Sequence, residues 1–140
     1  MRLSVFSPES SSQLLIDLAK IYQNCFNEKQ LSSESLQALI EDEQAQFYVT
    51  RFNGRHLGAL QVHRTGNQAQ LSLFTVRDVT RRRGVAKNLL SEVEKQLKSQ
   101  GVLQVSMHLD EIKEEEKNGV RLFMQAAGYQ LIGTVFTKTL

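Results

Sequence analysis

Cysteine and proline are scarce in this chain, whose 140 residues include one of each. A single cysteine, Cys25, excludes a disulfide within the chain. Cys25 lies in an apolar stretch with helical spacing, so we expect a small buried hydrophobic residue there rather than a nucleophile. The single proline and the absence of a Ser- or Gly-rich run give no sign of an interdomain linker. We therefore predict one domain over residues 1–140.

Long hydrophobic runs and a large excess of one charge are also missing. No apolar run approaches the roughly 18 residues that a membrane span requires. The N-terminus lacks the apolar core of a signal peptide, so we expect a cytoplasmic protein. The 17 basic residues are balanced by 15 acidic ones, for a formal net charge of +2 at pH 7. A general polyanion binder carries a larger basic excess, so we expect no nucleic-acid or membrane partner.

The first half of the chain predicts a strand, two helices and three antiparallel strands. Ser7-Pro8 has the pattern of a helix start, and apolar residues follow at helical spacing as far as Phe26. A second, shorter helix follows a Ser32-Ser33 cap. Asn53-Gly54 is a strong hairpin signal, and a second turn follows at 66–67. The three strands are predicted at about 46–53, 56–64 and 69–79, with His56 solvated after the first turn.

The second half predicts a helix over 85–99, a buried strand over 102–110, and a helix that ends near Ala127 before Gly128. A last strand follows, with a break at Gly133 and with Tyr129 in its core. The complete order is β-α-α-β-β-β-α-β-α-β. This order predicts an α/β fold with a mixed, mainly antiparallel sheet flanked by helices.

Three adjacent cations, Arg81, Arg82 and Arg83, stand at the junction between a predicted strand and the 85–99 helix. Nucleic acid, a membrane surface and a phosphorylated ligand could each attract them. The first N–H groups of a helix lack internal partners and form an anion site. Gly84 has no Cβ, and Ala86 is nearly as small, so a ligand could approach the backbone closely. We therefore favour one compact phosphorylated ligand, although a basic run can also be an ordinary solvated face.

The pattern Arg81-x-x-Gly84-x-Ala86, set after a strand and at the start of a helix, resembles the acetyl-CoA signature of the GNAT superfamily. The predicted order of elements is similar to that fold along the whole chain. The resemblance implies that the main chain around Phe74, Thr75 and Val76 binds the pantetheine arm of acetyl-CoA. It further implies that the pyrophosphate is bound by the amides of residues 82–86, Val85 included.

Two segments, "VRDVTRRRGVAKNLLSEV" and "FMQAAGY", together with "RFNGR", resemble the PanZ (PanM) family more narrowly. Membership would imply a regulator that binds acetyl-CoA and then aspartate 1-decarboxylase. It would promote self-cleavage of that zymogen to its pyruvoyl form and so regulate pantothenate and coenzyme A synthesis. The resemblance implies a partner contact at the "RFN" segment, with Arg51 and Asn53, and we add Arg77 as a further candidate. Turn formation alone would equally explain Asn53-Gly54.

No residue is assigned to catalysis. Many GNAT enzymes carry a tyrosine acid four residues before the glycine of the last helix, and Met124 occupies that position here. The asparagine that often reaches pantetheine falls on Lys117, and a one-residue shift that restores Asn118 still supplies no tyrosine. An N-acetyltransferase that uses water, His63 or His108 in proton transfer remains an alternative. A third possibility is an interaction module that needs no coenzyme A. The acidic run 110–117 lacks metal-ligand spacing, so no metal is expected.

Overall fold

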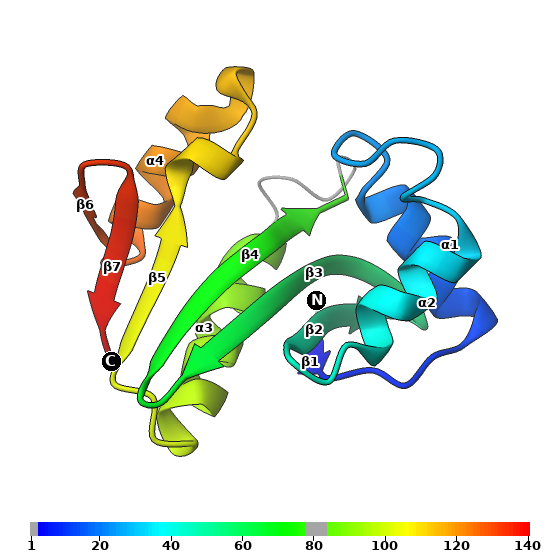
Figure 1. Ribbon diagram of the computed structural model, residues 1–140, viewed down its shortest axis with the longest axis horizontal. Coiled ribbons are helices and arrows are strands. Elements are labelled where there is room, and N and C mark those ends of the chain that lie inside the picture. Colours follow the sequence, from blue (N-terminus) through cyan, green and yellow to red (C-terminus); the bar gives the residue numbers. More distant parts are fainter. Residues whose placement is uncertain (1–2, 78–83) are drawn as a thin grey trace.

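The computed structural model describes residues 3–77 and 84–140. Within them, a seven-stranded sheet has the order β1-β2-β3-β4-β5-β7-β6 and carries helices on both faces (Figure 1). The strands are β1 (Ser4–Phe6), β2 (Gln46–Phe52), β3 (Arg55–Thr65), β4 (Gln68–Val76), β5 (Gln104–His108), β6 (Gln130–Ile132) and β7 (Val135–Thr139). The helices are α1 (Ser12–Ile21), α2 (Ser33–Glu41), α3 (Val85–Ser99) and α4 (Lys117–Ala126). Two single-turn 3₁₀ helices, Leu109–Glu111 and Glu114–Glu116, precede α4.

The sheet is mixed, as predicted. Neighbouring strands in the described sheet run antiparallel except β4 and β5, which are parallel and connected by α3. A parallel pair requires a crossover connection, and the amphipathic 85–99 helix provides it. The predicted break at Gly133 is confirmed. Gly133 has a φ of 63° in the turn between β6 and β7, so the last predicted strand is a hairpin of two strands.

Alternating residues of β2 pack into two separate cores. Phe47 and Val49 pack with α1 and α2, whereas Tyr48 packs with α3 and α4. Because side chains alternate across a strand, these cores lie on opposite faces of the sheet. Figure 1 shows α1 and α2 in front of the β1–β3 region and α3 behind the sheet.

The first helix differs from its prediction at both ends. It begins at Ser12, where the Ser11 side chain accepts a hydrogen bond from the Leu14 amide, and it ends at Ile21. Pro8 therefore lies before the helix, because Ser11 supplies a better cap closer to the apolar stretch. The prediction of a buried Cys25 is wrong, because the helix stops before it and leaves the thiol exposed in the following turn. The other helix predictions are confirmed, including the Ser32 cap of α2 and the 85–99 bounds of α3.

A buried carboxylate connects α1 to the β2–β3 hairpin. Asp17 is fully buried and accepts hydrogen bonds from the backbone amide of His56 at 2.8 Å, Arg55 Nε at 3.0 Å and Gln13 Nε2 at 2.9 Å. Its Oδ2 also lies 2.8 Å from His56 Nδ1. The prediction of a solvated His56 is therefore wrong, because the ring, in a residue 6% exposed, turns inward to this carboxylate.

The pKa of Asp17 follows from these contacts. Burial alone would raise it, but the hydrogen bonds from His56, Gln13 and Arg55 outweigh burial and hold the pKa below the ordinary value of 3.8. A carboxyl group with a lowered pKa stabilises the fold above its unfolded-state pKa. That stabilisation is lost as the pH falls through the folded-state pKa.

No helix among the described residues combines the length and the apolar character that crossing a membrane requires.

Replacing the carboxylate tests this network. We expect Asp17→Asn to lower the free energy of unfolding by about 2 kcal/mol at pH 7, because buried donors lose a charged acceptor. The difference in the free energy of unfolding between wild type and variant should become smaller as the pH falls below 3.8. Urea denaturation at pH 7, 4 and 3 measures both effects.

Glu92→Gln is the matched control, because Glu92 forms only a solvent-exposed pair with Lys95 at 3.1 Å. Its effect should stay within about 0.5 kcal/mol at every pH. A difference in the free energy of unfolding between wild type and Asp17→Asn that does not change with pH would contradict the role assigned to the Asp17 charge.

Candidate ligand-binding cleft

The candidate site begins where β4 and β5 separate. The two strands pair only as far as Leu71 with Met107, although β4 continues to Val76. Beyond Leu71, one edge of β4 therefore has no strand beside it, while the other edge stays paired with β3. This separation opens a cleft within a sheet that is otherwise continuous.

A bulge in β4 accompanies the separation. Gln61 of β3 lies opposite Ser72, but Ala59 lies opposite Thr75, so β4 carries one extra residue at this point. Leu73, inside the bulge, has a φ of 52°, which a leucine rarely adopts. A bulge bends its strand and increases the local twist. The bulge therefore explains why β4 departs from the direction of β5.

The backbone beyond the bulge has a defined orientation. The Arg77 amide donates to the Leu57 carbonyl at 2.8 Å, so the polar backbone groups of Arg77 face β3. Along an antiparallel strand these groups alternate in direction, so those of Thr75 also face β3. The backbone N–H and C=O groups of Phe74 and Val76 then face the cleft. The cleft wall thus offers hydrogen-bonding groups that an extended ligand could use.

The start of α3 lies at one end of the cleft. Gly84 is its N-cap residue, with a φ of 77° and no side-chain cap. Among the described residues, no atom lies within 4 Å of the position that a Cβ at Gly84 would take. The first N–H groups of the helix lack intrahelical partners and carry partial positive charge. This end of the cleft suits an anion such as a phosphate.

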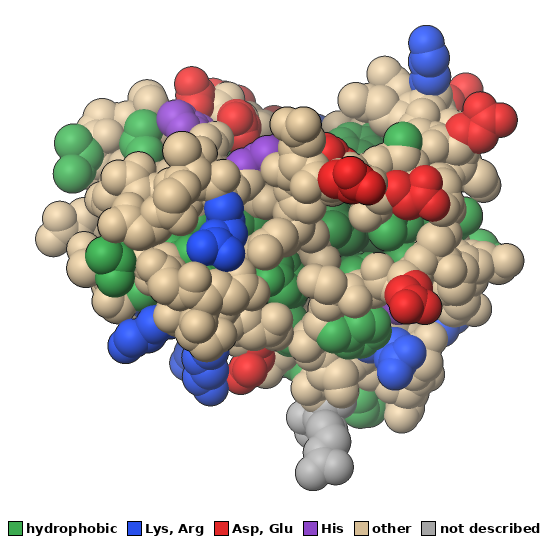
Figure 2. Space-filling view, turned by 60° about the horizontal axis from the view of Figure 1, so that its bottom comes forward, with side chains coloured by type: hydrophobic (Ala, Val, Ile, Leu, Met, Phe, Trp, Pro, Cys, Tyr) green, Lys and Arg blue, Asp and Glu red, His purple; other side chains and the backbone are tan. Residues whose placement is uncertain are grey.

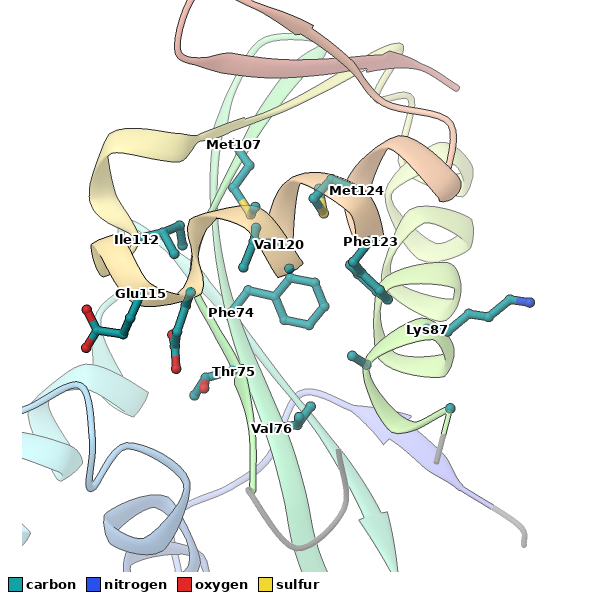
Figure 3. A pocket seen from close by; sticks show the side chains of 14 residues that line it. Phe74, Thr75, Val76, Lys87, Met107, Ile112, Glu115, Val120, Phe123 and Met124 are labelled. Atoms are coloured by element: carbon teal, nitrogen blue, oxygen red, sulfur yellow. The ribbon is translucent and has the colours of Figure 1, made fainter. Parts of the chain in front are cut away.

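The opposite wall of the cleft is apolar and comes from α4. In Figure 3, Phe74 extends into the space beneath α4 toward Val120 and Phe123. The rings of Phe74 and Phe123 make an edge contact at a centroid distance of 6.0 Å. The cleft has a volume of about 620 Å³ and is lined by Phe74, Thr75, Val76, Gly84, Ala86, Lys87, Met107, Ile112, Glu115, Glu116, Gly119, Val120, Phe123 and Met124. The arrangement fits a long, largely uncharged arm that carries an anionic group at one end.

Charge around the cleft is mixed. Glu115 and Lys87 lie at opposite sides of it, and Lys87 extends away from the cleft past α3 (Figure 3). On the face shown in Figure 2, Lys and Arg side chains lie among acidic and uncharged ones rather than in a continuous basic surface. Within residues 3–77 and 84–140, no three His, Cys, Asp or Glu side chains gather as metal ligands. On that face, the described basic side chains therefore offer no continuous surface to an extended polyanion.

The predicted ligand-binding residues divide into three groups. Phe74, Thr75, Val76, Gly84 and Ala86 line the cleft, and buried Val85 lies in the first turn of α3. Arg81, Arg82 and Arg83 lie outside the described residues. Asn118 is on the exposed side of α4, where its Oδ1 accepts a hydrogen bond from Arg121 at 2.6 Å. It is not among the lining residues, so the cleft geometry gives it no support as a ligand contact.

The groups considered for proton transfer do not gather in the cleft. Met124 is fully buried and lines it, but a thioether has no proton to donate. His63 on β3 and His108 on β5 are not among the described lining residues. Tyr129 is buried as predicted, and its hydroxyl donates to Glu94 Oε2 at 2.6 Å. Burial and the Glu94 carboxylate raise the pKa of Tyr129 far above its usual value, so it is a poor acid.

The predicted partner-binding residues lie at the same end of the sheet as Val76. Arg51 and Asn53 flank the tip of the β2–β3 hairpin, and the Arg77 amide bonds to Leu57 of β3. Arg51 and Asn53 are exposed, with the Arg51 guanidinium 5.0 Å from the centre of the Phe6 ring. Arg77 directly follows the cleft residue Val76, and Arg51 and Asn53 lie at the end of β3 that pairs with this part of β4.

Two residues that support the cleft were not identified from sequence. A Cβ at Gly58 would lie 2.8 Å from Val76 Cγ1 and 3.3 Å from the Thr75 carbonyl, so only glycine permits this approach of β3 to β4. Tyr22 donates a hydrogen bond to the Leu73 carbonyl at 2.7 Å. A glycine inside an apolar strand was a usable signal for the first. Nothing in the local pattern around Tyr22 indicates a partner in β4.

The comparisons with known proteins match the whole of this architecture. A family model described as "Acetyltransferase (GNAT) domain, PanZ" matches residues 3–136. Two curated proteins, each named "PanD regulatory factor", come from Salmonella typhimurium and Escherichia coli K12. Each is 35% identical to this chain over 130 residues, covering 92% of both sequences.

Solved structures agree with the fold. The putative N-acetyltransferase YhhK from E. coli, determined by NMR bound to coenzyme A, is 32% identical with a TM-score of 0.78 over the full length of both chains. An aminoglycoside 6′-N-acetyltransferase complexed with coenzyme A has a TM-score of 0.78 at 14% identity, covering 99% of this chain and 97% of that one. The second shows the fold alone.

Alanine at Gly84 tests whether the start of α3 is a binding site. We expect Gly84→Ala to destabilise the fold by about 1 kcal/mol through its left-handed backbone, and to weaken coenzyme A binding by about tenfold. The added Cβ would stand in the open space that an anion would enter. Calorimetric titration with coenzyme A and thermal unfolding measure the two effects.

Gly66→Ala is the matched control. Gly66 also has a left-handed backbone, with a φ of 61°, and a Cβ there would meet no atom within 4 Å, but it lies in the β3–β4 turn away from the cleft. It should lose similar stability and keep its affinity for coenzyme A. Equal affinity losses in both variants would show that strain, not the ligand site, explains the effect.

Proposed function

Because this chain belongs to the PanZ family of GNAT acetyltransferase domains, we propose that it is an acetyl-CoA-binding regulator of aspartate 1-decarboxylase (PanD). In this proposal it binds the decarboxylase precursor and promotes self-cleavage to the pyruvoyl form. Coenzyme A supply is thereby coupled to pantothenate synthesis. The two relatives named "PanD regulatory factor" support the partner, and the coenzyme A-bound relative YhhK supports the ligand class.

The observation that carries the ligand assignment is the cleft between β4 and α4. The backbone of Phe74 and Val76 would hydrogen-bond the amide groups of the pantetheine arm, as a neighbouring strand would. The amides from Gly84 to Ala86 would hold the pyrophosphate, and Arg81, Arg82 and Arg83 would add positive charge beside it. Phe123 and Val120 would cover the arm on the side of α4.

The same cleft favours binding without turnover. Acetyl transfer needs a group that protonates the departing thiolate, and the corresponding position holds the fully buried Met124. Tyr129, the tyrosine next in sequence, is held by Glu94. We therefore propose that acetyl-CoA is an effector here rather than a substrate.

The position of the hairpin supports a link between ligand and partner. Arg51, Asn53 and Arg77 would contact the decarboxylase, and Arg77 directly follows the cleft residue Val76. A ligand that orders the end of β4 changes the surface next to the hairpin tip. Acetyl-CoA then needs only a higher affinity for the partner-binding state to act as an effector.

A cleavage assay tests this function. Uncleaved aspartate decarboxylase from the same source is mixed with the protein and with acetyl-CoA, coenzyme A or neither, and chain cleavage is followed on a gel. We expect fast cleavage only with the protein and acetyl-CoA together. A cleavage rate that is the same with and without the protein and acetyl-CoA would contradict the proposed regulatory function. Loss of thioester with a panel of amines in a parallel assay would favour an N-acetyltransferase instead.

Arg51→Ala tests the partner surface separately from the ligand site. The variant should bind the decarboxylase precursor about tenfold more weakly, as expected when an interface arginine is truncated, and should bind acetyl-CoA normally. Arg64→Ala is the control, because Arg64 lies at the far end of β3 and bonds to Gln100 at 3.0 Å. Equal partner affinity in the two variants would place the contact elsewhere.

A further inference from the structure

We infer that Tyr22 is a positioning residue for the ligand cleft, because its hydroxyl holds the β4 bulge whose backbone forms one wall of that cleft. This role rests on the proposed function, in which acetyl-CoA lies along the backbone of Phe74 and Val76. Tyr22 itself touches no ligand in this arrangement. It acts through Leu73, which stands directly before the wall residues in the chain.

The contact is direct and starts from a buried side chain. Tyr22 follows the last residue of α1 and is completely buried. Its hydroxyl donates to the Leu73 carbonyl at 2.7 Å, across 51 positions of sequence. The Phe26 ring stacks on the Tyr22 ring at a centroid distance of 4.6 Å, which limits the movement of the side chain. The hydroxyl therefore reaches β4 from a fixed point on the helical layer.

The bulge needs such a contact. Leu73 has a left-handed backbone, which costs an L-residue with a Cβ about 1 kcal/mol or more relative to an extended conformation. β5 does not pair with β4 beyond Leu71, so that strand supplies no donor to the Leu73 carbonyl. The Tyr22 hydroxyl satisfies the carbonyl in its bulged position. Without it, this partly buried carbonyl would lose its partner, and a regular strand conformation would compete with the bulge.

The chemistry of the hydroxyl suits a permanent donor. Burial, with a smaller contribution from Cys25, raises the pKa of Tyr22 well above 10.0. The phenol therefore keeps its proton throughout the range in which binding is measured. A shift of Leu73 would rotate the next peptide groups, and the amide and carbonyl groups of Phe74 and Val76 would then leave the positions that a pantetheine arm requires.

Tyr22→Phe removes the hydroxyl and keeps the ring. Two ligands are titrated into wild type and variant: acetyl-CoA, and 3′-phospho-ADP, which is the nucleotide portion of coenzyme A without the pantetheine arm. We expect the variant to bind acetyl-CoA between about twofold and tenfold more weakly, the effect of one hydrogen bond, and to bind 3′-phospho-ADP as wild type does. A general loss of stability would instead lower the affinity for both ligands.

Tyr129→Phe is the matched control. Tyr129 is also a buried tyrosine that donates a hydrogen bond, to Glu94 at 2.6 Å, but it is not among the residues that line the cleft. The control should bind both ligands as wild type does, even if its unfolding temperature falls as much as that of Tyr22→Phe. Nitrogen–proton correlation spectra without ligand add a direct readout, because the amide signals of residues 73–76 should shift in Tyr22→Phe and stay in place in Tyr129→Phe.

Each other outcome has a distinct meaning. Unchanged acetyl-CoA affinity in Tyr22→Phe, or an equal loss for both ligands, overturns the positioning role while the proposed function stands. Failure of wild type itself to bind acetyl-CoA overturns the proposed function, and the positioning role with it. A selective loss for acetyl-CoA, together with shifted signals at residues 73–76, establishes the role.

Discussion

The separation of β4 from β5 is the constraint on which the rest of the molecule depends. A continuous sheet would leave no free backbone groups at its centre, because each strand would satisfy its neighbours. Here β4 and β5 pair only to Leu71, and the bulge at Leu73 turns the remaining backbone into one wall of a cleft. After β4 the chain enters the α3 crossover, and the start of this helix lies at the end of that wall. An extended hydrogen-bonding edge and the start of a helix thus lie together where the pairing of the sheet is interrupted.

Helix α1 connects this cleft to the β2–β3 hairpin. Asp17 binds the hairpin next to its tip through Arg55 and His56, while Tyr22, just past the end of the same helix, binds the bulge through Leu73. Asp17 and Tyr22 are themselves fully buried, so a shift of α1 would leave polar groups without their partners. The helix layer therefore fixes the hairpin tip and the cleft wall relative to each other. Such a connection is required if ligand binding in the cleft is to change partner binding at the hairpin.

Local signals in the sequence predicted most of the fold and the small residues at the α3 end of the cleft. Asn53-Gly54, the bounds of α3 and the small residues at 84 and 86 are features of neighbouring residues, and a pattern of that kind is visible without a structure. The errors share a different cause. The exposure of Cys25 depends on where α1 ends. The burial of His56 and the contact of Tyr22 depend on hydrogen bonds across 39 and 51 positions of sequence. A composition or spacing argument contains no information on such distant pairs, so the inward turn of His56 and the anchor of the bulge required the structure.

In the proposed function, Met124 suits a site that binds acetyl-CoA as an effector. Occupancy of a binding site reports ligand concentration only if the site does not consume the ligand, and a buried thioether can neither deprotonate an amine nor protonate a thiolate. The free energy available for signalling is then set by concentration relative to the dissociation constant. By linkage, a partner that binds the occupied state more tightly must strengthen acetyl-CoA binding by the same factor. The unreactive side chain at position 124 would thus preserve the ligand on which the coupling depends.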